Sequence, residues 1–116
     1  MTVLAYRKCS TCLKALKWLD ENGVKYEERA IIEDNPTAKE LKEWHKKSGL
    51  DLNRFFNTSG ILYREMKLKD KLPYLSDKEK YDLLASDGKL VKRPLVIGDD
   101  FALVGFKEKE WKEKLL

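Results

Sequence analysis

The sequence predicts an α/β fold, in which a four-stranded mixed sheet carries helices on its faces and has a helical insertion. Three observations lead to this prediction. A strand, a helix and a second strand follow one another at the N-terminus, helical patterns fill the middle of the chain, and a β-hairpin with a final helix closes it. A strand, a crossover helix and a strand at this spacing form a right-handed parallel unit. The hairpin supplies the other two strands.

Length and composition favour a single domain that spans residues 1–116. The chain is 42% hydrophobic and 38% charged, so it can bury a core and stay soluble. Its net charge of +4 is small, and lysines alternate with glutamates as on a solvated surface, so we expect no direct nucleic-acid binding. No apolar run is long enough to span a membrane, and Met1–Lys8 lacks the apolar core of a signal peptide. We therefore expect a cytoplasmic protein without a membrane partner.

The N-terminal unit begins with the apolar run Val3–Tyr6, which predicts a strand. An amphipathic pattern then predicts a helix over Ser10–Asn22, with Gly23 as its left-handed stop. Val24–Ile32 predicts the second strand. The spacing of the three elements favours a parallel pairing of the two strands.

The first helix has a recognisable apolar face and a polar start. Cys12, Leu16 and Leu19 follow the spacing i, i+4, i+7, so we expect them to face the core. Ser10 and Thr11 are favoured capping residues, and we expect them to cap the helix.

The helical insertion covers about residues 36–88. Asn35 is expected to cap its first helix, with Pro36 in the first turn and Gly49 at the end. Asp51 can cap the short turn that follows.

The second half of the insertion starts at the polar break Asn57–Gly60. We interpret this break as the cap of a helix over Ile61–Leu68; the alternative is that it supplies hydrogen-bond donors to a substrate. Ser76 and Glu79 form a capping box for one more helix, which Asp87–Gly88 closes.

The C-terminal end predicts a β-hairpin and a helix. Pro94–Ile97 and Phe101–Val104 are the two strands, Gly98–Asp100 is their turn, and Lys107–Leu116 is the helix. Together with the parallel unit, this order is the thioredoxin-like arrangement.

The two cysteines lie between the end of the first predicted strand and the first turn of the predicted helix. Unpaired N–H groups and the positive end of the helix dipole converge there and favour a thiolate. Arg7, Lys8 and Lys14 add positive charge. We therefore interpret Cys9 as the attacking sulfur and Cys12, one turn further, as the resolving thiol, which a C-x-x-C after a strand favours.

The cysteine pair has two alternative interpretations. The cysteines could be small buried residues at the start of a helix. They could also bind zinc, but C-x-x-C supplies only two ligands and His45 is the only histidine, so we expect no metal site.

Arg93 and Pro94 form the second element of the predicted site. Proline is tolerated at the first position of a strand. Arg93 would lie next to the thiolate and steady it or bind an anionic substrate. We assign catalysis to Cys9, Cys12 and Arg93, and substrate binding to Ser10, Thr11, Lys14 and Pro94.

Four motifs occur in order: Cys9–Cys12, Asn57-Thr58-x-Gly60, Lys92–Leu95 and Val104–Glu108. Together they resemble the arsenate reductase–Spx family of thioredoxin-like proteins over nearly the whole chain. The resemblance implies a glutaredoxin-type fold, a cis Pro94, and Cys9 at the position of the reactive cysteine.

The resemblance also implies partners. Arsenate reductases of this family use glutathione and glutaredoxin, and hold the oxyanion with several arginines. In this chain Asn53 occupies the position of one such arginine, with Arg54 beside it. Another of these arginines is replaced in the region Gly105–Lys107. Because lysine does not restore a guanidinium fork, arsenate reduction is disfavoured.

We therefore predict a thiol–disulfide oxidoreductase with no bound cofactor, which uses glutathione, glutaredoxin or thioredoxin as reductant. The alternative is an Spx-like redox-sensing regulator that binds the RNA polymerase α subunit, and a third option is a binding module whose cysteines are no longer used.

Overall fold

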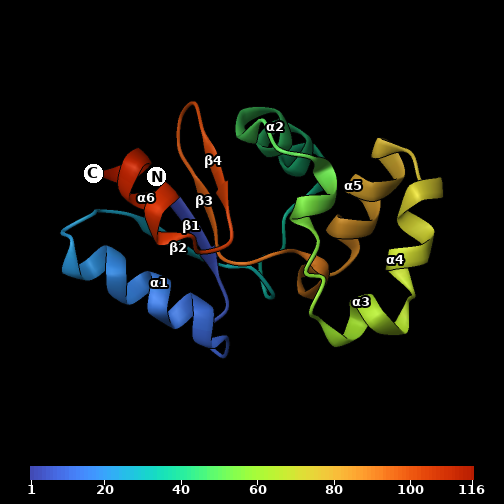
Figure 1. Cartoon of the computed structure of the whole chain (residues 1–116), viewed down its shortest axis with the longest axis horizontal. Coiled ribbons are helices and arrows are strands. Elements are labelled where there is room, and N and C mark those ends of the chain that lie inside the picture. The colour runs from blue at the N-terminus through green and yellow to red at the C-terminus, as the bar shows by residue number, and fades with distance from the viewer.

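The computed structural model describes all 116 residues and places one mixed sheet between two groups of helices (Figure 1). The strands are β1 (Thr2–Ala5), β2 (Glu27–Ala30), β3 (Leu95–Ile97) and β4 (Ala102–Val104), in the spatial order β2-β1-β3-β4. β1 and β2 are parallel, whereas β3 is antiparallel to both β1 and β4. The predicted four-stranded mixed sheet, with its parallel N-terminal unit and C-terminal hairpin, is confirmed.

The first and last helices cover one face of the sheet, and the helices of the insertion cover the other. α1 (Ser10–Glu21) and α6 (Glu108–Leu115) lie on one side, and the helices of the insertion lie on the other (Figure 1). The insertion contains α2 (Ala38–Ser48), α3 (Ile61–Glu65), α4 (Leu68–Lys71) and α5 (Asp77–Ser86), with 3-10 turns at Leu52–Phe55, Leu72–Tyr74 and Gly88–Leu90. No helix combines the length and apolar character needed to cross a membrane.

The central strand β1 explains why both groups of helices pack on the sheet. Side chains alternate between the two faces of a strand. Leu4 joins the core cluster that the insertion covers, whereas Val3 and Ala5 join the cluster that contains Trp111 and the buried face of α1. All three are at most 2% exposed, so these residues bury apolar side chains on both faces of the sheet.

The cap of α2 differs from the prediction. Thr37, not Asn35, is the N-cap, and Thr37 forms a capping box with Glu40. The Asn35 side chain instead donates to the Ala85 carbonyl at 2.6 Å, and thus ties the start of the insertion to α5. The prediction of an Asn35 cap is therefore wrong: the helix begins two residues later than such a cap would place it, and Thr37 caps it.

The predicted helix over Ile61–Leu68 begins at the expected residue but is not continuous: α3 ends at Glu65 and α4 begins at Leu68. Lys67 has φ 54, so the chain turns left-handed there and separates α3 from α4. Other predicted ends are confirmed: Gly23 and Gly49 have positive φ, and Ser76 forms its capping box with Glu79.

Candidate active site

Cys9 is itself the N-cap of α1. Its N–H donates to the Tyr6 carbonyl at 2.9 Å, its carbonyl accepts from the Leu13 N–H at 3.1 Å, and no side chain caps the helix. The prediction that Ser10 and Thr11 cap α1 is therefore wrong: the tight turn after β1 starts the helix at Ser10. The consequence is that the unpaired N–H groups of the first turn surround the Cys9 sulfur.

The surroundings of Cys9 favour its thiolate. Partial burial alone would raise the pKa of this thiol, but hydrogen bonds from the Cys12 N–H and the Arg93 guanidinium outweigh burial, so the Cys9 pKa is lowered from its ordinary value of 9.0. The Cys12 thiol and the Thr11 N–H act in the same direction. Cys9 is also partly exposed, as an attacking sulfur must be.

Cys12 has the opposite character. It is 0% exposed, and its sulfur accepts a hydrogen bond from the Tyr6 N–H at 3.4 Å. Burial raises the pKa of the Cys12 thiol to about 11, and the neighbouring Cys9 adds to this effect. Of the two sulfurs, Cys9 is therefore the one that ionises at the lower pH.

Arg93 lies near the cysteines, although it is more than 80 residues away from them in the sequence. The Arg93–Pro94 peptide bond is cis, as the resemblance implies. The guanidinium carbon lies 5.1 Å from the centre of the Tyr6 ring. Arg93 Nε and Nη1 are buried and have no hydrogen-bond partner, although buried donors normally have one. No carboxylate forms an ion pair with this guanidinium, so its positive charge can favour the Cys9 thiolate.

Cys9 and Arg93 open onto a cleft of about 620 Å³. Its lining combines cations, carboxylates, polar groups and a few apolar side chains. The lining residues are Tyr6, Cys9, Thr11, Asn57, Ser59, Gly60, Ile61, Leu62, Glu65, Asp87, Lys89, Lys92 and Arg93.

The predicted site residues are only partly brought together. Thr11 lines the cleft, whereas Ser10, Lys14 and Pro94 do not, and their part in substrate binding stays a prediction. Arg7 bonds to Glu28, with Nε 2.9 Å from the carboxylate, so its charge is already paired.

The polar break Asn57–Gly60 lies in the wall of the cleft, and its interpretation as the cap of the following helix is confirmed for the backbone alone. Gly60 is the N-cap of α3, and no side chain caps that helix. Asn57 is 9% exposed and binds the segment that precedes Arg93. Its backbone N–H donates to the Leu90 carbonyl at 2.8 Å, and its side-chain amide nitrogen donates to the Lys89 carbonyl. The alternative, in which the break faces a substrate, agrees with this geometry.

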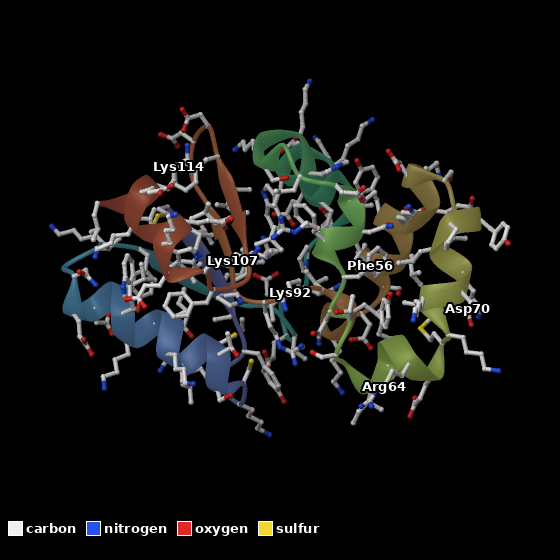
Figure 2. The ribbon with its side chains drawn as sticks, viewed as in Figure 1. Phe56, Arg64, Asp70, Lys92, Lys107 and Lys114 are labelled. Carbon is white, nitrogen blue, oxygen red and sulfur yellow. The ribbon has the colours of Figure 1, made fainter.

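A second hollow of about 430 Å³ adjoins the cleft, and the two share Thr11 and Lys92. Arg54 and Lys107 line it, and it contains no carboxylate. Figure 2 shows Lys92 and Lys107 between the sheet and the insertion, with Phe56 on the insertion side. The sequence motifs contain both lysines but do not show that they line one hollow, because the two lie on different segments that only folding brings together.

The sequence matches the model of the ArsC family over residues 4–114. The chain belongs to the ArsC family. It is 51% identical over 113 residues to the uncharacterized protein YusI of Bacillus subtilis, covering 97% of this chain and 96% of YusI. It is 27% identical over 111 residues to the global transcriptional regulator Spx of Staphylococcus epidermidis, covering 95% of this chain and 82% of Spx.

Among solved structures, an ArsC family related protein from Bacteroides fragilis superposes with a TM-score of 0.95 at 54% identity, covering 97% of this chain and 94% of that chain. This likeness confirms the thioredoxin-like fold. The ArsC family and the fold identify a thioredoxin-like redox protein.

Proposed function

We propose that this ArsC family protein is a thiol–disulfide oxidoreductase. The Cys9 thiolate attacks one sulfur of a substrate disulfide, forms a mixed disulfide and releases the other sulfur as a thiolate. Cys12 then loses its proton and attacks the Cys9 sulfur, which releases the bound half of the substrate as a thiol. The resulting Cys9–Cys12 disulfide is reduced by two electrons from glutathione, glutaredoxin or thioredoxin.

The observation that carries this proposal is the environment of Cys9. A partly exposed sulfur at a helix start has its pKa lowered by the Cys12 N–H and the Arg93 guanidinium, and it opens onto a cleft large enough for a small thiol adduct. Such an electropositive, accessible position is typical of reactive cysteines.

The burial of Cys12 bears on the reductant. Because Cys12 is 0% exposed, an external thiol meets Cys9 first. Glutathione can therefore release the substrate directly from the Cys9 mixed disulfide, without Cys12. The lysines and Arg93 that line the cleft suit the carboxylates of such a thiol.

This route predicts the behaviour of Cys12→Ser. We expect this variant to keep turnover with glutathione and to lose turnover with thioredoxin, since only the thioredoxin route needs the internal disulfide. The measurement is the steady-state reduction of a glutathione–peptide mixed disulfide with each reductant. Wild-type protein that turns over this substrate with neither reductant would contradict the proposed function.

A second candidate function follows from the similarity to Spx. The chain keeps both cysteines, and 95% of it aligns with that transcriptional regulator. In this case the Cys9–Cys12 pair would sense oxidation, and the partner would be the RNA polymerase α subunit. A pull-down with the α C-terminal domain tests it: retention of either the oxidised or the reduced protein supports this candidate, and failure of both removes it.

A further inference from the structure

Tyr6 contacts both cysteines and Arg93. It follows β1 directly, its carbonyl accepts the Cys9 N–H at 2.9 Å, and its own N–H donates to the Cys12 sulfur at 3.4 Å. Its ring is 5.1 Å from the guanidinium carbon of Arg93.

The ring of Tyr6 is held from two sides. Tyr6 is packed against both core clusters, the one under the insertion and the one under α1 and α6. Its hydroxyl makes no hydrogen bond to the protein, so the ring is placed by packing alone. A ring fixed in this way is a rigid surface for a planar cation.

No ion pair holds the guanidinium of Arg93 in place. Its Nε and Nη1 have no hydrogen-bond partner, and no carboxylate forms an ion pair with it. Other cations of the protein, such as Arg29, are fixed by hydrogen bonds to carboxylates. A carboxylate on Arg93 would draw the cation away from the thiolate, whereas an aromatic face orients the cation and leaves its N–H groups free.

We propose that Tyr6 is a positioning residue that holds the guanidinium of Arg93 beside Cys9 through its ring face. This inference rests on the proposed function, because it gives Tyr6 a role only if Cys9 reacts as a thiolate. Tyr6 forms no bond to the substrate; it acts through Arg93. What matters is the aromatic ring and not the hydroxyl.

The test compares the pH profile of Cys9 alkylation by iodoacetamide in Tyr6→Phe, Tyr6→Leu, Tyr6→Met and Arg93→Met. Tyr6→Phe should follow the wild-type profile. Tyr6→Leu and Tyr6→Met should shift it to higher pH and slow the reaction at pH 7 by about three- to thirtyfold, the range that follows from a cation–π contact. Two aliphatic variants are used so that one that fails to fold does not end the test.

Two comparisons separate positioning from a general loss of structure. Tyr26→Leu removes another half-buried tyrosine, whose hydroxyl bonds to Asp20, and should leave the profile unchanged. Tyr6→Leu combined with Arg93→Met should be no slower than Arg93→Met alone, because the ring acts only through the arginine.

The outcomes are distinct. If wild-type Cys9 is no more reactive than in the unfolded chain, the proposed function itself fails. If wild-type Cys9 is reactive and Arg93→Met slows it, but folded Tyr6→Leu or Tyr6→Met keeps the wild-type profile, the role of Tyr6 is overturned. Additive losses in the double variant would overturn it as well.

Discussion

Cys9→Ser is expected to reduce the turnover of a mixed disulfide to the uncatalysed background with every reductant. The serine hydroxyl is not ionised at neutral pH and forms no disulfide, so neither the glutathione route nor the Cys12 route can begin. Steady-state reduction of a glutathione–peptide disulfide measures this loss. It is the largest functional effect that we expect of any substitution in the chain.

The matched control is Cys12→Ser, which replaces the second sulfur by the same hydroxyl and should keep the glutathione route. Both variants should retain the wild-type far-ultraviolet circular dichroism, because each substitution replaces a single sulfur atom by oxygen. The loss of packing is smaller at Cys9, which is partly exposed, than at Cys12, which is buried. Residual turnover of Cys9→Ser comparable to that of wild type would show that another group is the nucleophile.

Trp111→Ala is expected to cause the largest loss of stability, about 3–5 kcal/mol of unfolding free energy. Trp111 is 0% exposed and is the only buried residue of α6. Its ring contacts Phe106 and Trp18 edge-on, at centroid distances of 4.8 and 6.0 Å, and its Nε1 donates to the Gly105 carbonyl at 3.0 Å. Without this side chain α6 loses its anchor on the sheet.

Urea unfolding followed by circular dichroism measures this loss. Lys112→Ala, an exposed neighbour on the same helix, serves as control and should change stability by less than about 0.5 kcal/mol. A loss below about 1 kcal/mol for Trp111→Ala would mean that α6 contributes little to the fold, contrary to the packing described here.

The parts of the fold that depend on local signals could be predicted from the sequence. The apolar run of β1, the C-x-x-C at the start of α1 and the capping box of Ser76 and Glu79 all act between residues close in the chain. Gly23 and Gly49 mark helix ends for the same reason, since each is the residue that adopts positive φ most easily.

The parts that the sequence could not settle depend on contacts between distant segments. Thr37 caps α2 in place of the predicted Asn35, whose side chain donates to the Ala85 carbonyl, 50 residues away. Likewise, Asn57 bonds to the segment before Arg93, and a polar run before a helix does not reveal such a partner. The ring of Tyr6 under Arg93 is a contact of the same kind.

The central claim, that the fold ionises Cys9 and not Cys12, is tested most directly by the pH dependence of alkylation at each cysteine of the wild-type protein. Mass spectrometry of the two peptides separates the two rates, and urea-unfolded protein is the reference. Because a lowered pKa enlarges the thiolate fraction at a given pH, Cys9 should reach half its maximal rate below pH 9.0, and Cys12 only near pH 11. A Cys9 midpoint at or above that of the unfolded chain would contradict the account.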